Sequence, residues 1–212
     1  MKRRITIPPM LSDLVLTGIA ALDGTEFDRR KSCPECGGPL SGYDWKSRTF
    51  ATIEEGKGTR NIVVRVKRFS CGRCGNICSA DAPFYPDTRV GAPVVDLCRV
   101  LGREMPFSRA AAYLAAIGIV IDRGSCRNYA NRDSGEISTT EIFGRRIPSS
   151  VLSLSLLAGR CPEGSPVPGA EALAACGFPP AFRAAPYVPV PPEKRDERDN
   201  EEQEKEREPE QE

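Results

Sequence analysis

The chain has 212 residues, a formal net charge of +1 and no histidine. The lack of histidine excludes a Ser-His or Cys-His nucleophile pair, a histidine general base and any histidine metal ligand. Glycine and proline are both abundant, at 19 residues each, which predicts small folded units joined by loops rather than one large core.

Charge is divided between two parts of the chain. Residues 193–212 carry eleven acidic and five basic side chains, a net of −6, which leaves +7 for the rest of a chain whose total is +1. A basic body with an acidic tail favours a polyanionic partner, with nucleic acid first; the alternative is a solvated surface with a solubilising tail. We expect residues 184–212 to be disordered, and the acidic end to compete with DNA for the basic face.

The N-terminal segment, residues 1–30, combines a basic start with a short amphipathic helix predicted at Leu11–Leu22. Its beginning faintly resembles a signal peptide, but Pro8, Pro9 and Asp13 interrupt the apolar stretch. No segment approaches the roughly 20 apolar residues that a membrane-spanning helix needs. We therefore expect a cytoplasmic protein with no membrane partner.

Residues 31–80 contain two CxxC motifs, each followed by glycine: Cys33-Pro-Glu-Cys36-Gly and Cys71-Gly-Arg-Cys74-Gly. The two-residue spacer lets both thiolates of a pair reach one ion, and a following glycine permits the positive φ of a tight turn. Two such pairs predict a closed site in which Cys33, Cys36, Cys71 and Cys74 hold one structural zinc ion. The alternative is a redox-active pair, but the βαβ pattern typical of that chemistry is absent.

The 34 residues between the cysteine pairs include two strand-like runs, Arg48–Glu54 and Asn61–Phe69, joined by a Gly-Lys-Gly turn at residues 56–58. Closing that loop costs about 3 kcal/mol plus a constant, whereas structural zinc supplies roughly 10–16 kcal/mol. This pattern therefore predicts a zinc β-ribbon over residues 31–80.

Residues 81–91 are rich in proline and glycine and read as a linker before a three-helix unit at 92–135. Pro93 suits the first turn of a helix that runs to Arg103. Ser108 is expected to cap a second helix, Arg109–Ile117, which Gly118 ends. Asp122 is expected to cap a third helix, Arg123–Arg132. Their number and order are typical of a helix-turn-helix domain, although the connection at 118–122 is longer than a tight turn.

The third predicted helix has one apolar face and one polar face. Cys126 and Tyr129 lie on the apolar face, whereas Arg127, Asn128 and Asn131 lie on the opposite one. Arginine pairs with guanine and asparagine with adenine in the major groove, so these three side chains are candidate base readers. Seven further cations are candidate phosphate contacts: Lys57, Arg60, Arg65, Lys67, Arg68, Arg123 and Arg132. The alternative for both sets is an ordinary solvated surface.

Residues 136–183 are expected to form a short helical segment, with one helix from Ser149 or Ser150 to Leu157 and another at Gly169–Cys176. Cys98 and Cys126 are expected to pack in a core, and Cys78 to pack as a small apolar residue. The predicted fold class is small α+β: a four-cysteine zinc β-ribbon, a helix-turn-helix unit, short C-terminal helices and a disordered tail.

The order of these elements resembles a known family. Cys33-Pro-Glu-Cys36-Gly, the string Val66-Lys-Arg-Phe-Ser-Cys-Gly-Arg-Cys74 and the three following helices are similar to the N-terminal DNA-binding head of prokaryotic insertion-sequence transposases, over residues 31–132. That resemblance implies binding to the ends of a mobile element. In that family a following domain with an RNase H-like fold and three metal-binding carboxylates performs catalysis. Only 80 residues follow Arg132 here, without that pattern, and Glu136, Glu141, Glu163 and Glu171 are assigned no catalysis.

The sequence therefore predicts a non-enzymatic, zinc-stabilised protein that binds double-stranded DNA and has no small-molecule substrate. A second copy of the chain and a catalytic transposase subunit are the further partners considered. Two alternatives stay open: a protein adaptor that uses the apolar segment 147–176, and an RNA-binding module that uses the basic hairpin.

Overall fold

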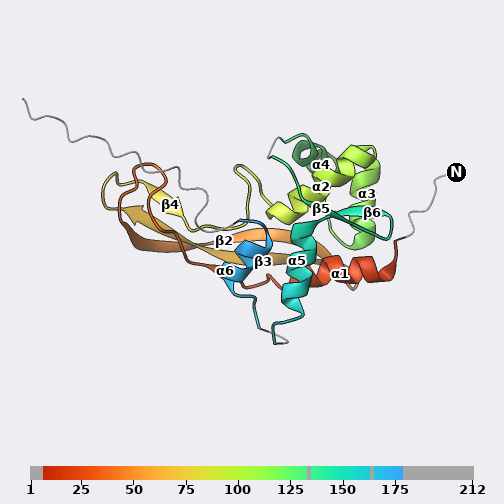
Figure 1. Ribbon diagram of the computed structural model, residues 1–212, viewed down its shortest axis with the longest axis horizontal. Coiled ribbons are helices and arrows are strands. Elements are labelled where there is room, and N and C mark those ends of the chain that lie inside the picture. Colours follow the sequence, from red (N-terminus) through yellow and green to blue (C-terminus); the bar gives the residue numbers. More distant parts are fainter. Residues whose placement is uncertain (1–6, 133–134, 163–164, 179–212) are drawn as a thin grey trace, which may run out of the picture.

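The computed structural model describes residues 7–132, 135–162 and 165–178, so the expectation for the tail at 184–212 lies outside the described residues. A long β-hairpin runs along the molecule, and most of the helices gather around one end of it (Figure 1). The fold is small α+β, as predicted.

The hairpin consists of β2 (Leu40–Glu55) and β3 (Gly58–Cys71), antiparallel from the tight turn to the pair Leu40–Cys71. Both strands extend further toward the cysteines than predicted, because cross-strand pairing continues through a polar stretch with no apolar alternation. The short strands β1 (Glu26–Phe27) and β4 (Ile77–Ser79) add to β3, parallel and antiparallel respectively.

Four helices confirm the predicted helical segments of the N-terminal and central parts: α1 (Pro9–Ala20), α2 (Ala92–Glu104), α3 (Phe107–Ile117) and α4 (Arg123–Ala130). The Asp122 carboxylate caps α4 by accepting a bond from the Ser125 N–H at 2.9 Å. Gly118 ends α3 with φ of 101°. The predicted Ser108 cap is wrong, because α3 already begins after Pro106, whose fixed φ suits a helix start.

The connection between α3 and α4 lies against the edge of β2 near the hairpin turn. Ile119 forms a β-bridge with Ile53, the Val120 N–H donates to Thr52 O at 2.8 Å, and the Glu54 N–H donates to Gly118 O at 2.8 Å. These bonds satisfy backbone N–H and C=O groups of the α3–α4 connection, which is longer than a tight turn. They also join the three-helix unit to the hairpin.

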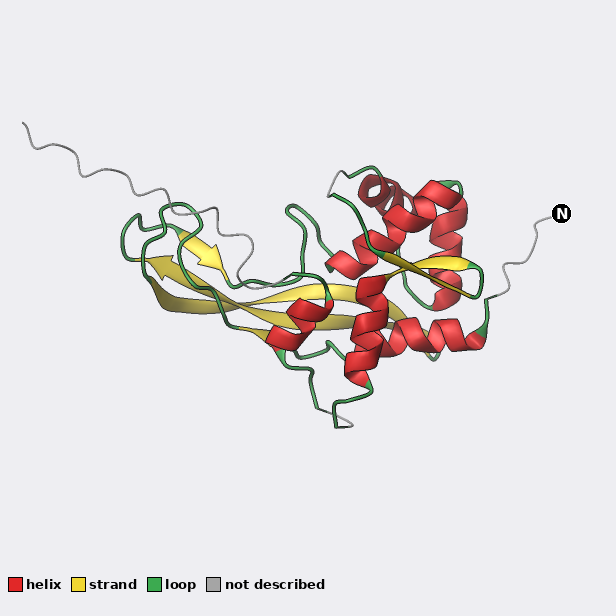
Figure 2. Cartoon of the chain, viewed as in Figure 1, coloured by secondary structure: helices red, strands yellow, loops and turns green. Residues whose placement is uncertain are grey.

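The C-terminal part contains a small hairpin that the sequence analysis missed. Strands β5 (Thr139–Ile142) and β6 (Arg145–Pro148) pair antiparallel around a turn at Phe143 and Gly144, and lead directly into α5 (Ser149–Ala158) (Figure 2). The prediction of helices alone over 136–183 is therefore wrong, since these four-residue strands are too short for a periodic signal. The second helix, α6 (Gly169–Ala175), is confirmed.

One hydrophobic cluster extends over the hairpin and the helices, which differs from the separate small units expected from composition. Ile62 and Val64 of β3 and Leu97 of α2 are fully buried members of it. The segment predicted as a linker takes part too: Phe84 is buried and meets the Phe50 ring edge-to-face at 5.8 Å. Among the described helices, none is long and apolar enough to cross a membrane.

Candidate metal centre and nucleic-acid interface

The four predicted zinc ligands come together at the end of the long hairpin. The sulfur atoms of Cys33, Cys36, Cys71 and Cys74 all lie within 4.8 Å of one another. The Cys33 and Cys74 sulfurs are 3.7 Å apart, and the Cys36 and Cys71 sulfurs are 3.4 Å apart. A tetrahedral zinc ion with bonds of about 2.3 Å separates its sulfur ligands by about 3.8 Å, so this set fits such an ion.

Each CxxC turn is closed by the same pair of backbone hydrogen bonds. In the first turn, the Gly37 N–H donates to Cys33 O at 2.9 Å and the Cys33 N–H donates to Gly38 O at 3.1 Å. The second turn repeats these bonds, from Gly75 to Cys71 at 3.0 Å and from Cys71 to Asn76 at 3.0 Å. The glycine after each second cysteine has a positive φ, 68° at Gly37 and 73° at Gly75, as the sequence predicts.

Two cysteines of the cluster, Cys71 and Cys74, differ strongly in the pKa of their thiols. The backbone N–H groups of Cys74 and Arg73 point at the Cys71 sulfur and lower the pKa of that thiol to about 6. The Asn76 N–H lowers the pKa of Cys74, but desolvation and the neighbouring sulfurs outweigh it and raise that pKa to about 12. A divalent cation compensates the charge of closely spaced thiolates, so this donor set suits a metal ion.

Gly38 is a feature of the metal centre that the sequence analysis missed. A Cβ atom on Gly38 would lie 2.8 Å from the Cβ of Arg73, 3.0 Å from the Cys71 sulfur and 3.2 Å from the Cys36 sulfur. Only glycine fits between the two turns at this point. The doubled glycine that follows Cys36 is the signal in the sequence.

Helix α4 presents its two predicted faces as the sequence indicates. Cys126 and Tyr129 are buried, whereas Arg127, Asn128 and Asn131 are exposed. Arg123, at the start of the helix, is exposed as well. The structure therefore gathers four polar side chains on one solvent-facing surface, which we call the α4 face: Arg123, Arg127, Asn128 and Asn131.

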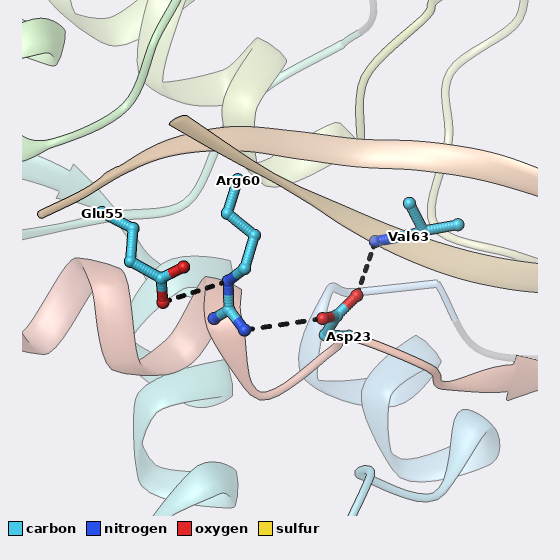
Figure 3. A network of polar contacts seen from close by, with 4 residues as sticks. All are labelled: Asp23, Glu55, Arg60 and Val63. Atoms are coloured by element: carbon cyan, nitrogen blue, oxygen red, sulfur yellow. Dashed lines mark hydrogen bonds and ion pairs between the residues drawn. The ribbon is translucent and has the colours of Figure 1, made fainter. Parts of the chain in front are cut away.

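The cations predicted to contact phosphate fall into two groups. Those of the first group already form ion pairs or hydrogen bonds with other residues of the chain. Figure 3 shows Arg60 between two carboxylates, 3.7 Å from Asp23 and 3.4 Å from Glu55. Asp23 also accepts a bond from the Val63 N–H at 2.8 Å, so this network ties the end of α1 to β3. Arg60 thus has a structural role near the hairpin turn.

Three other cations predicted to contact phosphate also bind acceptor oxygens of the chain itself. Arg65 forms an ion pair with Glu26, Arg68 with Asp44, and Arg132 donates to the carbonyl oxygens of residues 86 and 87 at 2.6 and 3.0 Å. The second group is Lys57, Lys67 and Arg123, for which no carboxylate partner occurs in the described part of the chain.

Two exposed aromatic rings lie among the cations of the hairpin, and the sequence analysis did not single them out. Trp45, 37% exposed, has the Arg65 guanidinium 4.9 Å and the Lys67 ammonium 5.8 Å from its ring centre. Tyr43, 57% exposed, lies at a β-bulge with the Arg68 guanidinium 5.5 Å away. The signal available was the chain's single tryptophan beside a basic strand.

Comparisons of this chain with family models, with curated proteins and with solved structures found no match.

Proposed function

We propose that this protein is a non-enzymatic, zinc-stabilised DNA-binding protein in which the α4 face reads base edges of duplex DNA. The observation that carries the proposal is the exposure of Arg127 and Asn128 on α4, and of Asn131 directly after it, while the opposite face of the helix is buried. Arginine and asparagine are the side chains best suited to bidentate contacts with guanine and adenine. A helix held on one side and polar on the other can enter a major groove.

Fewer cations are available to contact phosphate than the basic composition suggests. Lys57, Lys67 and Arg123 keep their charge available, whereas the engaged arginines would have to break an intramolecular contact first. The three available cations hold the DNA backbone and give affinity without sequence preference. Lys57 lies in the hairpin turn, and the α3–α4 connection, which pairs with β2 near that turn, leads directly to Arg123 at the start of α4.

In this proposal the zinc ion has a structural role. Cys33, Cys36, Cys71 and Cys74 supply all four ligands of a closed tetrahedral site, which leaves no position for a substrate. The ion joins the chain before β2 to the end of β3 and so fixes the end of the hairpin opposite the helices. The resemblance of residues 31–132 to the DNA-binding head of a transposase supports the same function, with a catalytic transposase subunit as a candidate partner.

Fluorescence anisotropy with a library of labelled duplex fragments tests the proposal. At low salt we expect submicromolar affinity for a preferred subset and weaker binding to the remainder. Arg127→Ala should relax the preference, with a loss of about 1–3 kcal/mol on the preferred sequence, and Lys67→Ala should weaken all sequences alike. The matched control is Arg109→Ala, another exposed arginine on α3. Negligible duplex binding at low salt, or equal losses for Arg127→Ala and Arg109→Ala, would contradict the proposal.

A second candidate function is binding of single-stranded nucleic acid, RNA included, on the hairpin. The exposed rings of Tyr43 and Trp45 with cations beside them favour it, because stacking of a base on an aromatic ring is worth about 1–3 kcal/mol. Competition between single-stranded RNA and duplex DNA separates the two candidates. Trp45→Ala should weaken the single strand alone; if it weakens neither ligand, the hairpin does not bind bases.

The adaptor alternative has less support. It relied on the apolar content of residues 147–176, but Val151 and Leu154 of that segment are buried within the chain. Leu156, which is 68% exposed, is the one large apolar side chain of α5 that is exposed, and it does not by itself indicate an interface.

A further inference from the structure

A cavity of about 240 Å³ lies between the long hairpin, the loop at residues 30–34 around the first cysteine of the cluster, and the end of α6. It is separate from the surface proposed to bind nucleic acid. Val66 of β3 lines the cavity, whereas its neighbours Arg65 and Lys67 point to the other face of the strand, because side chains alternate along a strand.

Arg48 is the most informative residue of the cavity wall. Its side chain is half buried, its guanidinium lies 3.7 Å from the centre of the Phe84 ring, and it donates one hydrogen bond to Thr88 O at 2.8 Å. No carboxylate forms an ion pair with Arg48 among the residues that the structure describes. A partly desolvated cation without an anion is costly, so an anionic ligand would stabilise it.

Positive charge also exceeds negative charge among the other side chains that line the cavity. Arg30 pairs with Asp81 at 3.3 Å and donates to Ser79 O at 2.7 Å, and the exposed Lys31 lines the cavity without a carboxylate partner in the described chain. Three cations face one carboxylate, which leaves an excess of two positive charges. That excess matches a phosphate monoester, which carries nearly two negative charges at neutral pH.

Most of the remaining wall is apolar, although Ser32 and Ser79 also line it. Val66, Phe84, Leu173 and Phe178 line the same cavity, and its volume exceeds what a bare phosphate would fill. A wall of this kind suits a small apolar or planar group joined to the phosphate. A cluster of cations beside an apolar wall is the pattern of a site that recognises both parts of one ligand.

We propose that this cavity is an anion-binding site for a phosphate monoester with a small apolar body, held through Arg48, Arg30 and Lys31. The phosphate can belong to a free small molecule or to the 5′ end of a nucleic-acid strand, because both present the same group. The proposal does not depend on duplex binding by α4.

Isothermal titration of the zinc-loaded full-length protein tests it, with phenyl phosphate, inorganic phosphate and benzoate as probes in low-chloride buffer. We expect saturable one-to-one binding, tightest for phenyl phosphate, weaker for inorganic phosphate and weakest for benzoate. Arg48→Met keeps much of the apolar stem and removes the charge, so it should weaken phenyl phosphate at least about tenfold. Arg109→Met, which alters an exposed arginine of α3 outside the cavity, is the matched control and should bind as the unmodified protein does.

Lys31→Met provides a second variant, because this exposed side chain can be replaced without disturbing the core. It should weaken phenyl phosphate several-fold even if Arg48→Met does not fold. Displacement of phenyl phosphate by a 5′-phosphorylated dinucleotide but not by its 5′-hydroxyl form would assign the site to strand ends; displacement by neither would assign it to a free small molecule. Absence of binding up to about 10 mM, or equal affinities for Lys31→Met, Arg48→Met and Arg109→Met, would overturn the proposal.

Discussion

Gly38 and the two glycines that follow the CxxC motifs allow the cysteine turns to approach each other. Gly37 and Gly75 adopt a positive φ, which a side chain would strain, whereas Gly38 is required by contact alone. The sequence could predict the first kind, because a glycine after CxxC has a known backbone role. It could not predict the second, because the close approach of Gly38 to Arg73 depends on how the two turns pack.

Gly38→Ala tests this packing. The added methyl group would lie 2.8 Å from the Arg73 Cβ and 3.0 Å from the Cys71 sulfur, and such overpacking costs about 1–3 kcal/mol. We expect weaker zinc binding in competition with a chromophoric chelator. Gly72→Ala is the control, since its Cβ meets no atom closer than 3.9 Å. Equal zinc affinities in the two variants would show that the contact is not limiting.

The roles of the hairpin arginines also depend on tertiary structure. Composition shows that residues 57–73 are basic, but not which charges are neutralised. Asp23 and Glu26, more than 30 positions earlier, reach Arg60 and Arg65 because the end of α1 and β1 lie beside β3. Such pairings require the strand register, which the sequence alone does not provide.

At the level of elements, the helices α1 and α5 pack closely together and join the N-terminal segment to the C-terminal part of the chain. Gly18 of α1 lies against the backbone of α5, where an added Cβ would be 2.8 Å from Ser155 N and 3.1 Å from Val151 O. Leu11 and Val15 of α1 and Val151 of α5 are fully buried. This packing buries the apolar side chains of α5 that face α1, so those side chains are not free to form an interface with a partner.

Gly18→Ala should therefore destabilise the protein, because the contacting atoms belong to the backbone and cannot move aside. We expect a loss of about 1–3 kcal/mol in the free energy of unfolding, measured by urea denaturation with circular dichroism. Gly159→Ala at the end of α5 is the control, since its nearest contact would be 3.7 Å away and its φ of −67° suits alanine. A Gly18→Ala variant as stable as Gly159→Ala would contradict the close packing of α1 on α5.

The elements that could be predicted are those with local signals. Asp122 and Gly118 mark the ends of helices whose positions follow from side-chain and backbone chemistry, and both act as expected. The β5–β6 hairpin has no comparable signal, because its strands pair only four residues each and β5 has no buried residue. The contact between the α3–α4 connection and β2 is likewise tertiary, so the length of that connection gave no indication of it.

At the scale of the whole molecule, the long hairpin joins the cysteine cluster at one end to the helical unit at the other (Figure 1). The 14 residues of β3 span about 45 Å at roughly 3.3 Å each. The cysteine cluster therefore does not contact α4, and the proposed zinc ion would act on the proposed function by holding the hairpin that carries Lys67 and Trp45. The sequence predicted the hairpin and the helices but not this separation, which depends on the register of the hairpin.

The proposed zinc ion is central to this account, because it would fix the end of the hairpin that lies opposite most of the helices. Native mass spectrometry of the purified full-length protein, with elemental analysis of the same sample, tests it most directly. We predict one zinc ion per chain, retained on dilution and lost in Cys71→Ser, while Cys161→Ser, which alters a cysteine outside the cluster, keeps the metal. A chain that purifies without metal and does not take up zinc, or a Cys71→Ser variant that keeps a full equivalent, would contradict the account.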